Sequence, residues 1–359
     1  MPGRTQILFL VPYPPGHAPS QRFRVELFLP ELEKAGIRYR LQSFLDEKTW
    51  QNLYKGGGFF TKAWGVIKGF ARRWKIVLFG LSKYSHVFIH REAAPLGPPV
   101  YEWLISKLFR KKIVYDFDDA IWLPNTSREN KLVAWIKAFW KVKYICKWSY
   151  KVVAGNDYLS EYAREYSQQV VKIPTTVDTE GQHNLLKDQA GEKITIGWTG
   201  SHSTMKFLDE IVPVLKTLEQ RFSFDFIVIS NKAPAFNLER SRFMQWNAET
   251  EVKDLMALNI GVMPLENDAW GEGKCGFKLI QYLALGIPAV ASPVGVNKII
   301  VEEGKNGFLC DSPAEWERAL SLLLSDEVKR REMGLAGREK IEKEYSLRSQ
   351  VENFLGLFR

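Results

Sequence analysis

The segment from Gly273 to Pro288 reads GKCGFKLIQYLALGIP and decides how this chain folds. Apolar side chains recur at helical spacing from Phe277 to Ala284, so we expect a helix that begins near Phe277 and ends at Gly286. The residues that follow, from Pro288 to Ala291, have the composition of a short buried strand. A helix that leads into a buried strand is the repeating unit of a parallel α/β sheet.

The start of this helix also has the composition of an anion-binding site. The first N–H groups of a helix have no partner within it, and the helix dipole adds partial positive charge at the same end. Lys274 and Lys278 would add full charges, and a phosphate could contact the backbone at Cys275, Gly276 and Phe277. The same residues fit an ordinary glycine-capped core helix equally well.

Length and composition indicate a folded protein of two domains. The chain has 359 residues, of which 45% are hydrophobic and 25% charged. Its three cysteines, Cys146, Cys275 and Cys310, form no C-x-x-C pair, which argues against a zinc site or a disulfide framework. No apolar run reaches the roughly 18 residues of a membrane span. We therefore expect a cytoplasmic protein, with peripheral attachment to the inner face of the cell membrane as an open alternative.

The net charge of +9 indicates an acidic partner: nucleotide phosphates, anionic lipid or nucleic acid. Nucleic acid is the weakest of these, because no helix-turn-helix, zinc or RNA-binding signature accompanies the charge.

Strands and helices alternate along both halves of the chain. In the first half a strand at Gln6–Val11 precedes a loop and a helix over 20–35, with Ser20 as N-cap and Gly36 as terminator. Further strands are expected at 37–44, 87–90, 113–115, 151–154 and 170–173. In the second half, strands are expected at 194–198, 224–229, 260–264, 289–292 and 307–309, with a helix over 203–221.

These patterns predict an α/β protein of two doubly wound, Rossmann-like domains that face a central cleft. We expect an N-terminal domain over 1–180, a C-terminal domain over 181–345, and a final helix within 346–359 that crosses back to the first domain. The polar segment 179–192 is expected to be the linker.

Two segments combine aromatic residues and lysines at helical spacing, 59–79 and 131–151. The second contains lysines 131, 137, 141, 143, 147 and 151. Such helices suit the interface of an anionic bilayer. The alternative is that each aromatic stripe packs on its own sheet while the lysines are solvated. The aromatic residues of 59–79 are the more dispersed, which favours the membrane interpretation there.

The motifs of the second half resemble those of family 4 glycosyltransferases. The resemblance rests on KLIQYLALGIPAVASPVGVN from Lys278 to Asn297 and GKNGFL from Gly304 to Leu309. IPTTVD at 173–178 and GWTGS at 197–201 are similar to the family's domain-boundary and glycine-loop segments. The resemblance implies a GT-B fold and retaining transfer of a sugar from a nucleotide donor. It is looser in the first half, at SQR (20–22) and YDFDD (115–119).

The chain departs from this family at one place. The family usually carries two glutamates eight positions apart, which reach the sugar and ribose of the donor. Here the second position is Gln281, the first is Gly273, and Glu272 lies one residue off register. An amide can still hydrogen-bond a ribose diol, without charge.

The resemblance and the residues together suggest roles for individual side chains. Lys278 would stabilise the departing diphosphate, with Lys274 and the Gly200-Ser201 loop beside it, and with Lys206 as a weaker candidate whose alternative is a solvated lysine. These residues, with Glu272, Cys275, Gly276, Phe277 and Gln281, form the expected donor site.

Asp118 and Asp119 follow a strand and could orient or deprotonate an acceptor hydroxyl, or cap a helix. His17, Arg22 and Arg91 could contact an acceptor phosphate. GT-B enzymes, as the resemblance implies, generally need no metal for the diphosphate, and we expect neither a metal nor an obligatory cofactor.

We therefore expect a retaining glycosyltransferase that uses a UDP- or GDP-sugar and a glycan, lipid-linked or other glycoconjugate acceptor, in polysaccharide or glycoconjugate biosynthesis. The nucleotide would bind mostly to the C-terminal domain and the acceptor to the N-terminal one. Two alternatives stay open. One is a nucleotide-sugar 2-epimerase of the same architecture, and the other is a membrane-associated scaffold that binds nucleotide-sugar with little turnover.

Overall fold

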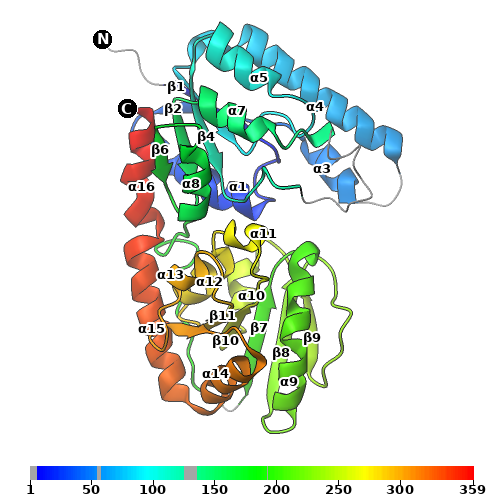
Figure 1. Ribbon diagram of the computed structural model, residues 1–359, viewed down its shortest axis with the longest axis vertical. Coiled ribbons are helices and arrows are strands. Elements are labelled where there is room, and N and C mark those ends of the chain that lie inside the picture. Colours follow the sequence, from blue (N-terminus) through cyan, green and yellow to red (C-terminus); the bar gives the residue numbers. More distant parts are fainter. Residues whose placement is uncertain (1–5, 55–57, 125–135, 192) are drawn as a thin grey trace. The chain divides into compact units, whose positions relative to one another are not determined.

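The computed structural model describes residues 6–54, 58–124, 136–191 and 193–359, which divide into two compact units (Figure 1). The first unit is Met1–Thr175 together with Val351–Arg359, and the second is Thr176–Gln350. The divisions thus fall after residue 175 rather than 180, and after residue 350 rather than 345.

Six parallel strands form the sheet of the first unit. They are β1 (Gln6–Val11), β2 (Arg38–Ser43), β3 (His86–His90), β4 (Lys112–Phe117), β5 (Lys151–Ala154) and β6 (Val170–Lys172), in the order β2-β1-β3-β4-β5-β6. Each lies within two residues of its expected position. The chain turns outward from β1 to β2 and returns on the other side at β3. In such sheets ligands bind at the carboxyl ends of the strands beside this reversal.

Helices connect these strands. They are α1 (Pro19–Arg24), α2 (Leu29–Lys34), α3 (Glu47–Tyr54), α4 (Phe59–Phe79), α5 (Val100–Trp103), α7 (Lys141–Trp148) and α8 (Asp157–Arg164), with 3₁₀ helices at Glu26–Phe28 and Leu81–Lys83 and a short π-helix at Leu104–Leu108. The expected single helix over 20–35 was wrong, because it is broken into α1, a 3₁₀ turn and α2. Pro30, which has no N–H to donate, lies in the first turn of α2. Ser20 is not the N-cap either, since α1 begins after Ala18.

The lysine-rich segment 131–151 is only partly helical where it is described. Residues 131–135, among them Lys131, Leu132 and Trp135, lie outside the described residues. The backbone turns at Ala138 with a positive φ of 52°, and α7 follows. Lys141, expected to be one of the solvated lysines, is buried and its ammonium contacts Glu92 at 2.7 Å.

The second unit has a parallel sheet of six strands as well. They are β7 (Ile194–Thr199), β8 (Phe224–Ser230), β9 (Ser241–Gln245), β10 (Ile260–Met263), β11 (Ala289–Ala291) and β12 (Gly307–Leu309), in the order β12-β11-β10-β7-β8-β9. The order reverses between β7 and β10, as in dinucleotide-binding domains. Sequence reasoning missed β9, because this edge strand is mostly exposed and has no apolar alternation.

The helices of the second unit are α9 (Val212–Glu219), α10 (Glu251–Leu255), α11 (Ala269–Glu272), α12 (Phe277–Ala284), α13 (Asn297–Ile300), α14 (Pro313–Ser325) and α15 (Glu327–Glu344). The helix expected over 203–221 was wrong in type, because residues His202–Glu210 form a 3₁₀ helix before α9. The expected linker packs on this unit: the Lys187 N–H donates to the Leu285 carbonyl at 2.8 Å, and Arg338 donates to the Thr179 carbonyl at 2.7 Å.

The last helix, α16 (Leu347–Leu355), belongs to both units, since the division falls at Val351, and a 3₁₀ turn at Gly356–Phe358 follows it. Within the first unit the Phe354 ring stacks on Phe28 with centroids 4.2 Å apart, and Phe358 lies 6.2 Å from Phe9. Among the described residues, no helix has both the length and the apolar character that would let it span a bilayer.

Candidate active site

The donor-side candidates of the second unit gather where the sheet order reverses. Gly200 follows β7 directly, and α12 begins after Gly276. Tyr282 of α12 ties the two elements together, because its hydroxyl oxygen accepts the Thr199 N–H at 2.9 Å. The start of α12 is therefore held beside the carboxyl end of β7.

Gly276 has to be glycine at the start of α12. Its φ is +66°, a left-handed conformation that side chains disfavour, and a Cβ there would lie 2.2 Å from the Ile300 side chain. Gly286, at φ +71°, follows the last turn of the helix, which confirms the expected end. Both glycines therefore fix where α12 begins and ends.

Lys278 and Gly200 meet at this point. The Lys278 ammonium lies 5.5 Å from the centroid of the Trp198 ring, within cation–π range. A Cβ on Gly200 would lie 2.9 Å from Lys278 Cε and 2.6 Å from the Trp198 ring. Only a residue without a side chain leaves room for the lysine here. Two segments that are distant in sequence, the end of β7 and the start of α12, thus place a cation and backbone N–H groups at one end of the sheet.

The other donor-side candidates lie around the same elements with partners of their own. The Lys206 ammonium is 3.3 Å from a Glu266 carboxylate oxygen, and both side chains are exposed. Lys274 lies 4.8 Å from the centroid of the Trp270 ring. These partners hold the side chains in solvent-accessible positions.

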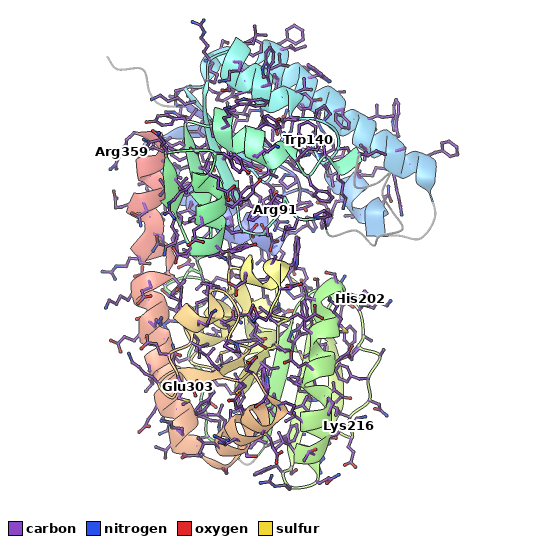
Figure 2. All side chains as sticks on the ribbon, viewed as in Figure 1. Arg91, Trp140, His202, Lys216, Glu303 and Arg359 are labelled. Atoms are coloured by element: carbon purple, nitrogen blue, oxygen red, sulfur yellow. The ribbon has the colours of Figure 1, made fainter. Side chains whose placement is uncertain are left out.

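Three further donor-side candidates, Glu272, Ser201 and Cys275, differ in exposure. The Glu272 carboxylate lies 3.8 Å from the Lys298 ammonium. Ser201 is exposed and its hydroxyl lies 2.9 Å from that of Ser203, next to His202, which Figure 2 labels. Cys275 is buried, and it can therefore offer a ligand its backbone but not its thiol.

Gln281 is buried rather than presented on the surface. Its side chain is 1% exposed, and its Nε2 finds no hydrogen-bond partner within the described parts of the chain. A buried amide donor without an acceptor costs about 1–3 kcal/mol. It lies one turn beyond Phe277 and Lys278, on the same side of α12.

In the first unit, buried polar residues join the ends of β3 and β4. His90 and Asp116 are register partners, and His90 Nδ1 lies 2.7 Å from Asp116 Oδ2. Arg24 from α1 also binds Asp116, with Nε donating to Oδ1 at 3.1 Å. On the other side of the imidazole, the Ser20 hydroxyl lies 2.9 Å from Nε2. An ionised Asp116 only accepts, so Nδ1 carries the proton and a neutral ring accepts the Ser20 O–H.

A second ion-pair cluster lies beside this one. Arg91, which Figure 2 labels, donates from Nε and Nη2 to Asp118 Oδ1 at 3.0 and 2.8 Å, and from Nη2 to Asp119 Oδ2 at 2.6 Å. Arg91 has a φ of +62°, and its carbonyl accepts the Tyr115 hydroxyl at 2.7 Å. Residues held in such conformations concentrate at functional sites. Three of the predicted residues therefore form one contact group.

Electrostatics distinguish the roles of these carboxylates. Burial would raise the pKa of Asp118, but the nearby Arg91 guanidinium outweighs it and holds that pKa well below its usual range. Burial likewise opposes the lowered pKa of Asp116, and Arg24 overcomes it. Both groups are carboxylates at neutral pH. A carboxylate of such low pKa is a weak base, so Asp118 is better suited to accept a hydrogen bond from a hydroxyl than to remove its proton.

The other two acceptor-side candidates, His17 and Arg22, contact side chains of the first unit. His17 Nε2 is 2.8 Å from a Glu47 carboxylate oxygen of α3. The Arg22 guanidinium lies over the Phe23 ring at 4.9 Å. Among the described residues, no three His, Cys, Asp or Glu side chains are placed to share a metal ion.

Sequence reasoning missed Ser20, Arg24, His90 and Asp116 as a functional group. Ser20 was interpreted as a helix cap, and His90 and Asp116 lie inside strands that look like core. The available signal was a run of polar residues at the carboxyl ends of adjacent strands, where parallel sheets place their ligands.

Comparison with solved structures identifies the fold. Sucrose-phosphate synthase from Thermosynechococcus elongatus superposes with a TM-score of 0.71 and 14% identity over 99% of this chain and 98% of its own. HepE from Anabaena, solved with UDP and glucose, gives a TM-score of 0.67 and 14% identity over 98% and 99%. A glycosyltransferase from Rickettsia africae gives 0.65 and 14% over 100% and 98%. The two Rossmann-like units are therefore those of the GT-B fold.

Sequence comparison matches parts of this chain to known proteins. Residues 193–326 match the family described as glycosyl transferases group 1. Spore coat protein SA of Bacillus subtilis is 30% identical over 81 residues, an alignment that covers 22% of this chain and 22% of that protein.

Proposed function

We propose that this protein is a retaining glycosyltransferase that moves a sugar from a UDP- or GDP-sugar to a glycan, lipid-linked or other glycoconjugate acceptor. The observation that carries the proposal is the meeting of Lys278, Gly200 and the start of α12 at the reversal point of the second sheet. The family match of residues 193–326 supports it independently.

The nucleotide diphosphate would bind at the start of α12. Its charge would be met by Lys278 and by the backbone N–H groups of the first turn, with Lys274 and the Gly200-Ser201 loop beside them. As the bond between the sugar and the diphosphate breaks, negative charge grows on the leaving oxygen, and a fixed cation stabilises it most at that moment. Gln281 Nε2, which has no acceptor among the described residues, would donate a hydrogen bond to the nucleotide.

The acceptor would bind at the carboxyl ends of β3 and β4 in the first unit. Asp118 would accept a hydrogen bond from the acceptor hydroxyl and orient it, while Arg91 fixes the carboxylate. Ser20 is within hydrogen-bonding range of both His90 and Asp118, and its single proton can serve only one of them at a time. Ser20 is thus a positioning residue that links the buried His90–Asp116 pair to the acceptor carboxylate.

The experiment is a thermal-shift panel of UDP-, GDP-, ADP- and TDP-sugars on the purified protein, with and without Mg²⁺. Stabilisation by one nucleotide class, independent of metal, supports the proposal and names the base. Products then separate the alternatives: a 2-epimerase converts the donor sugar without an acceptor, and a scaffold binds it without turnover. Absence of any shift would contradict the proposal.

The acceptor-side assignment has its own test. Asp118→Asn and Ser20→Ala should lower the rate of transfer and leave the nucleotide-induced shift unchanged, because these residues lie in the other unit. Ser20→Thr, which keeps a hydroxyl, is the matched control and should retain more of the rate. Equal loss in both Ser20 variants would refute the role of the hydroxyl.

A further inference from the structure

Helix α4 packs against the rest of the first unit through two glycines and a buried arginine. Its inward side carries Gly65, Gly69 and Arg73, together with Ile76 and Val77. A Cβ on Gly65 would lie 2.3 Å from the Thr49 side chain, and one on Gly69 would lie 2.7 Å from the Phe44 ring. Arg73 is fully buried and donates to the Val11 and Ala93 carbonyls, each at 2.7 Å. A charged residue thus anchors the helix.

The aromatic and aliphatic stripe of the same helix faces solvent. The exposed fractions are 86% for Phe60, 58% for Trp64, 54% for Ile67, 40% for Trp74 and 42% for Leu78. The intervals from Phe60 through Trp64 to Ile67, and from Trp74 to Leu78, are three or four residues, so these side chains share one face. A helix that hides an arginine and exposes its large apolar side chains has the opposite polarity from an ordinary surface helix.

The charged side chains of this helix are all positive. From Phe59 to Phe79 the sequence contains Lys62, Lys68, Arg72, Arg73 and Lys75, and no aspartate or glutamate. Lys68 and Lys75 are exposed and flank the apolar side chains. The Lys68 ammonium lies 5.9 Å from the Trp64 ring centroid. Aromatic side chains between lysines match the boundary between headgroups and acyl chains of an anionic bilayer.

The first unit also has an apolar groove near α4. It has a volume of about 270 Å³ and lies between α5 and α7, where two prolines, Val100 and the rings of Trp103, Trp140, Tyr144 and Trp148 line it. The Trp74 ring at one end of the α4 stripe contacts Tyr101 of α5 at a centroid distance of 4.9 Å. Figure 1 shows α4, α5 and α7 in the same part of the first unit, and Figure 2 labels Trp140 on this side. The stripe and the groove thus lie on helices of the same unit that contact one another through α5, and we call them together the α4–α7 face.

We infer that the α4–α7 face docks on an anionic lipid bilayer, with α4 lying in the headgroup boundary and the groove holding an acyl chain. This inference deepens the proposed function, because a docked bilayer would present a lipid-linked acceptor to the unit that carries Asp118. Only this choice of acceptor rests on the proposed function. A second copy of the chain fits the face less well, because it would bring the exposed Lys68 and Lys75 of each copy together, and like charges repel.

The test is co-sedimentation of the full chain with vesicles of phosphatidylcholine alone, or with about 30% phosphatidylglycerol added. We expect binding to the anionic vesicles, little to the neutral ones, and loss of binding in high salt. Trp64→Ser/Ile67→Ser and, separately, Lys68→Glu/Lys75→Glu should each weaken binding at least about tenfold. Trp140→Ser in the groove should weaken it several-fold.

Matched controls are available in the second unit. Val328 and Leu335 of α15 are 67% and 55% exposed, so Val328→Ser/Leu335→Ser removes similar exposed apolar surface elsewhere and should leave vesicle binding unchanged. Circular dichroism and the nucleotide-induced thermal shift, measured on every variant, show that each is folded.

Several outcomes would overturn the inference. They are equal binding to neutral and anionic vesicles, no binding to either, and equal losses in the α4 variants and the α15 control. Another is light scattering that shows a dimer which Trp64→Ser/Ile67→Ser dissociates, without vesicle binding, since the face would then join two copies. A nucleotide shift without vesicle binding refutes this inference alone, and vesicle binding without any nucleotide shift refutes the proposed function alone.

Discussion

Asp116→Ala should destabilise the first unit by about 3–5 kcal/mol, the usual cost of removing one partner from a buried ion pair. The side chains of Asp116 and Arg24 are each 1% exposed. Without the carboxylate, the guanidinium keeps the Ile173 carbonyl as a partner but loses this ion pair, and His90 Nδ1 loses its acceptor. The control is Asp157→Ala: Asp157 and Lys172 are 50% and 48% exposed, and such surface pairs contribute below about 1 kcal/mol.

Scanning calorimetry of both variants measures how much each one lowers the melting temperature. For a unit of this size, about 1 kcal/mol lowers the melting temperature by about 2–4 °C, so Asp116→Ala should lower it by about 6–20 °C and Asp157→Ala by only a few. The effect should also depend on pH. The pKa of Asp116 is lowered in the folded state, so its contribution is present above the unfolded pKa and is lost as the pH falls through the folded pKa.

At neutral pH the melting temperatures of the two variants should therefore differ by the full amount. In strong acid the melting temperature of Asp116→Ala should approach that of the wild type. Equal melting temperatures for the two variants at neutral pH would refute the account of this buried network.

Three further predictions concern the second unit. Lys278→Ala should raise the dissociation constant of the nucleotide, measured by calorimetry, about tenfold to a hundredfold through loss of a charge-assisted contact; Lys253→Ala on α10 should leave it unchanged, and an equal effect would contradict the assignment. Gln281→Glu should bring no gain in binding or turnover and should lower stability, because it buries a charge at a site that is 1% exposed; a large gain would instead indicate a dead donor site. Gly276→Ala should lose about 2–4 kcal/mol in urea unfolding, from a positive φ and from overlap with α13. Gly304 also has a positive φ, +72°, but has open space around it, so Gly304→Ala should lower the free energy of unfolding only by the cost of the backbone conformation. Equal losses in the two variants would refute the packing argument for Gly276.

The fold could be predicted from local signals. Alternating buried strands and amphipathic helices fix a doubly wound architecture, and the glycines at 276 and 286 mark the ends of α12 before any tertiary contact is known. The start of α12 was also predictable as a site, because anion binding by a helix N-terminus depends on neighbouring residues. The meeting of Lys278 with Gly200 was implied only by the order of motifs in a known family.

The site in the first unit could not be predicted in the same way. His90 and Asp116 become partners only through the register of β3 against β4, and Ser20 reaches them because α1 begins earlier than expected. A single sequence does not contain that register. Likewise, the periodicity of α4 defined its apolar stripe but could not say that the stripe faces outward, because this depends on the hydrogen bonds that bury Arg73.

The central claim is that the second unit binds a nucleotide-sugar through the start of α12. Isothermal calorimetry of UDP and GDP with wild type and Lys278→Ala, without added metal, tests it most directly. We expect wild type to bind one of the two nucleotides and the variant to bind it at least about tenfold more weakly. Binding of neither nucleotide by the wild type, or equal binding by both proteins, would contradict the account.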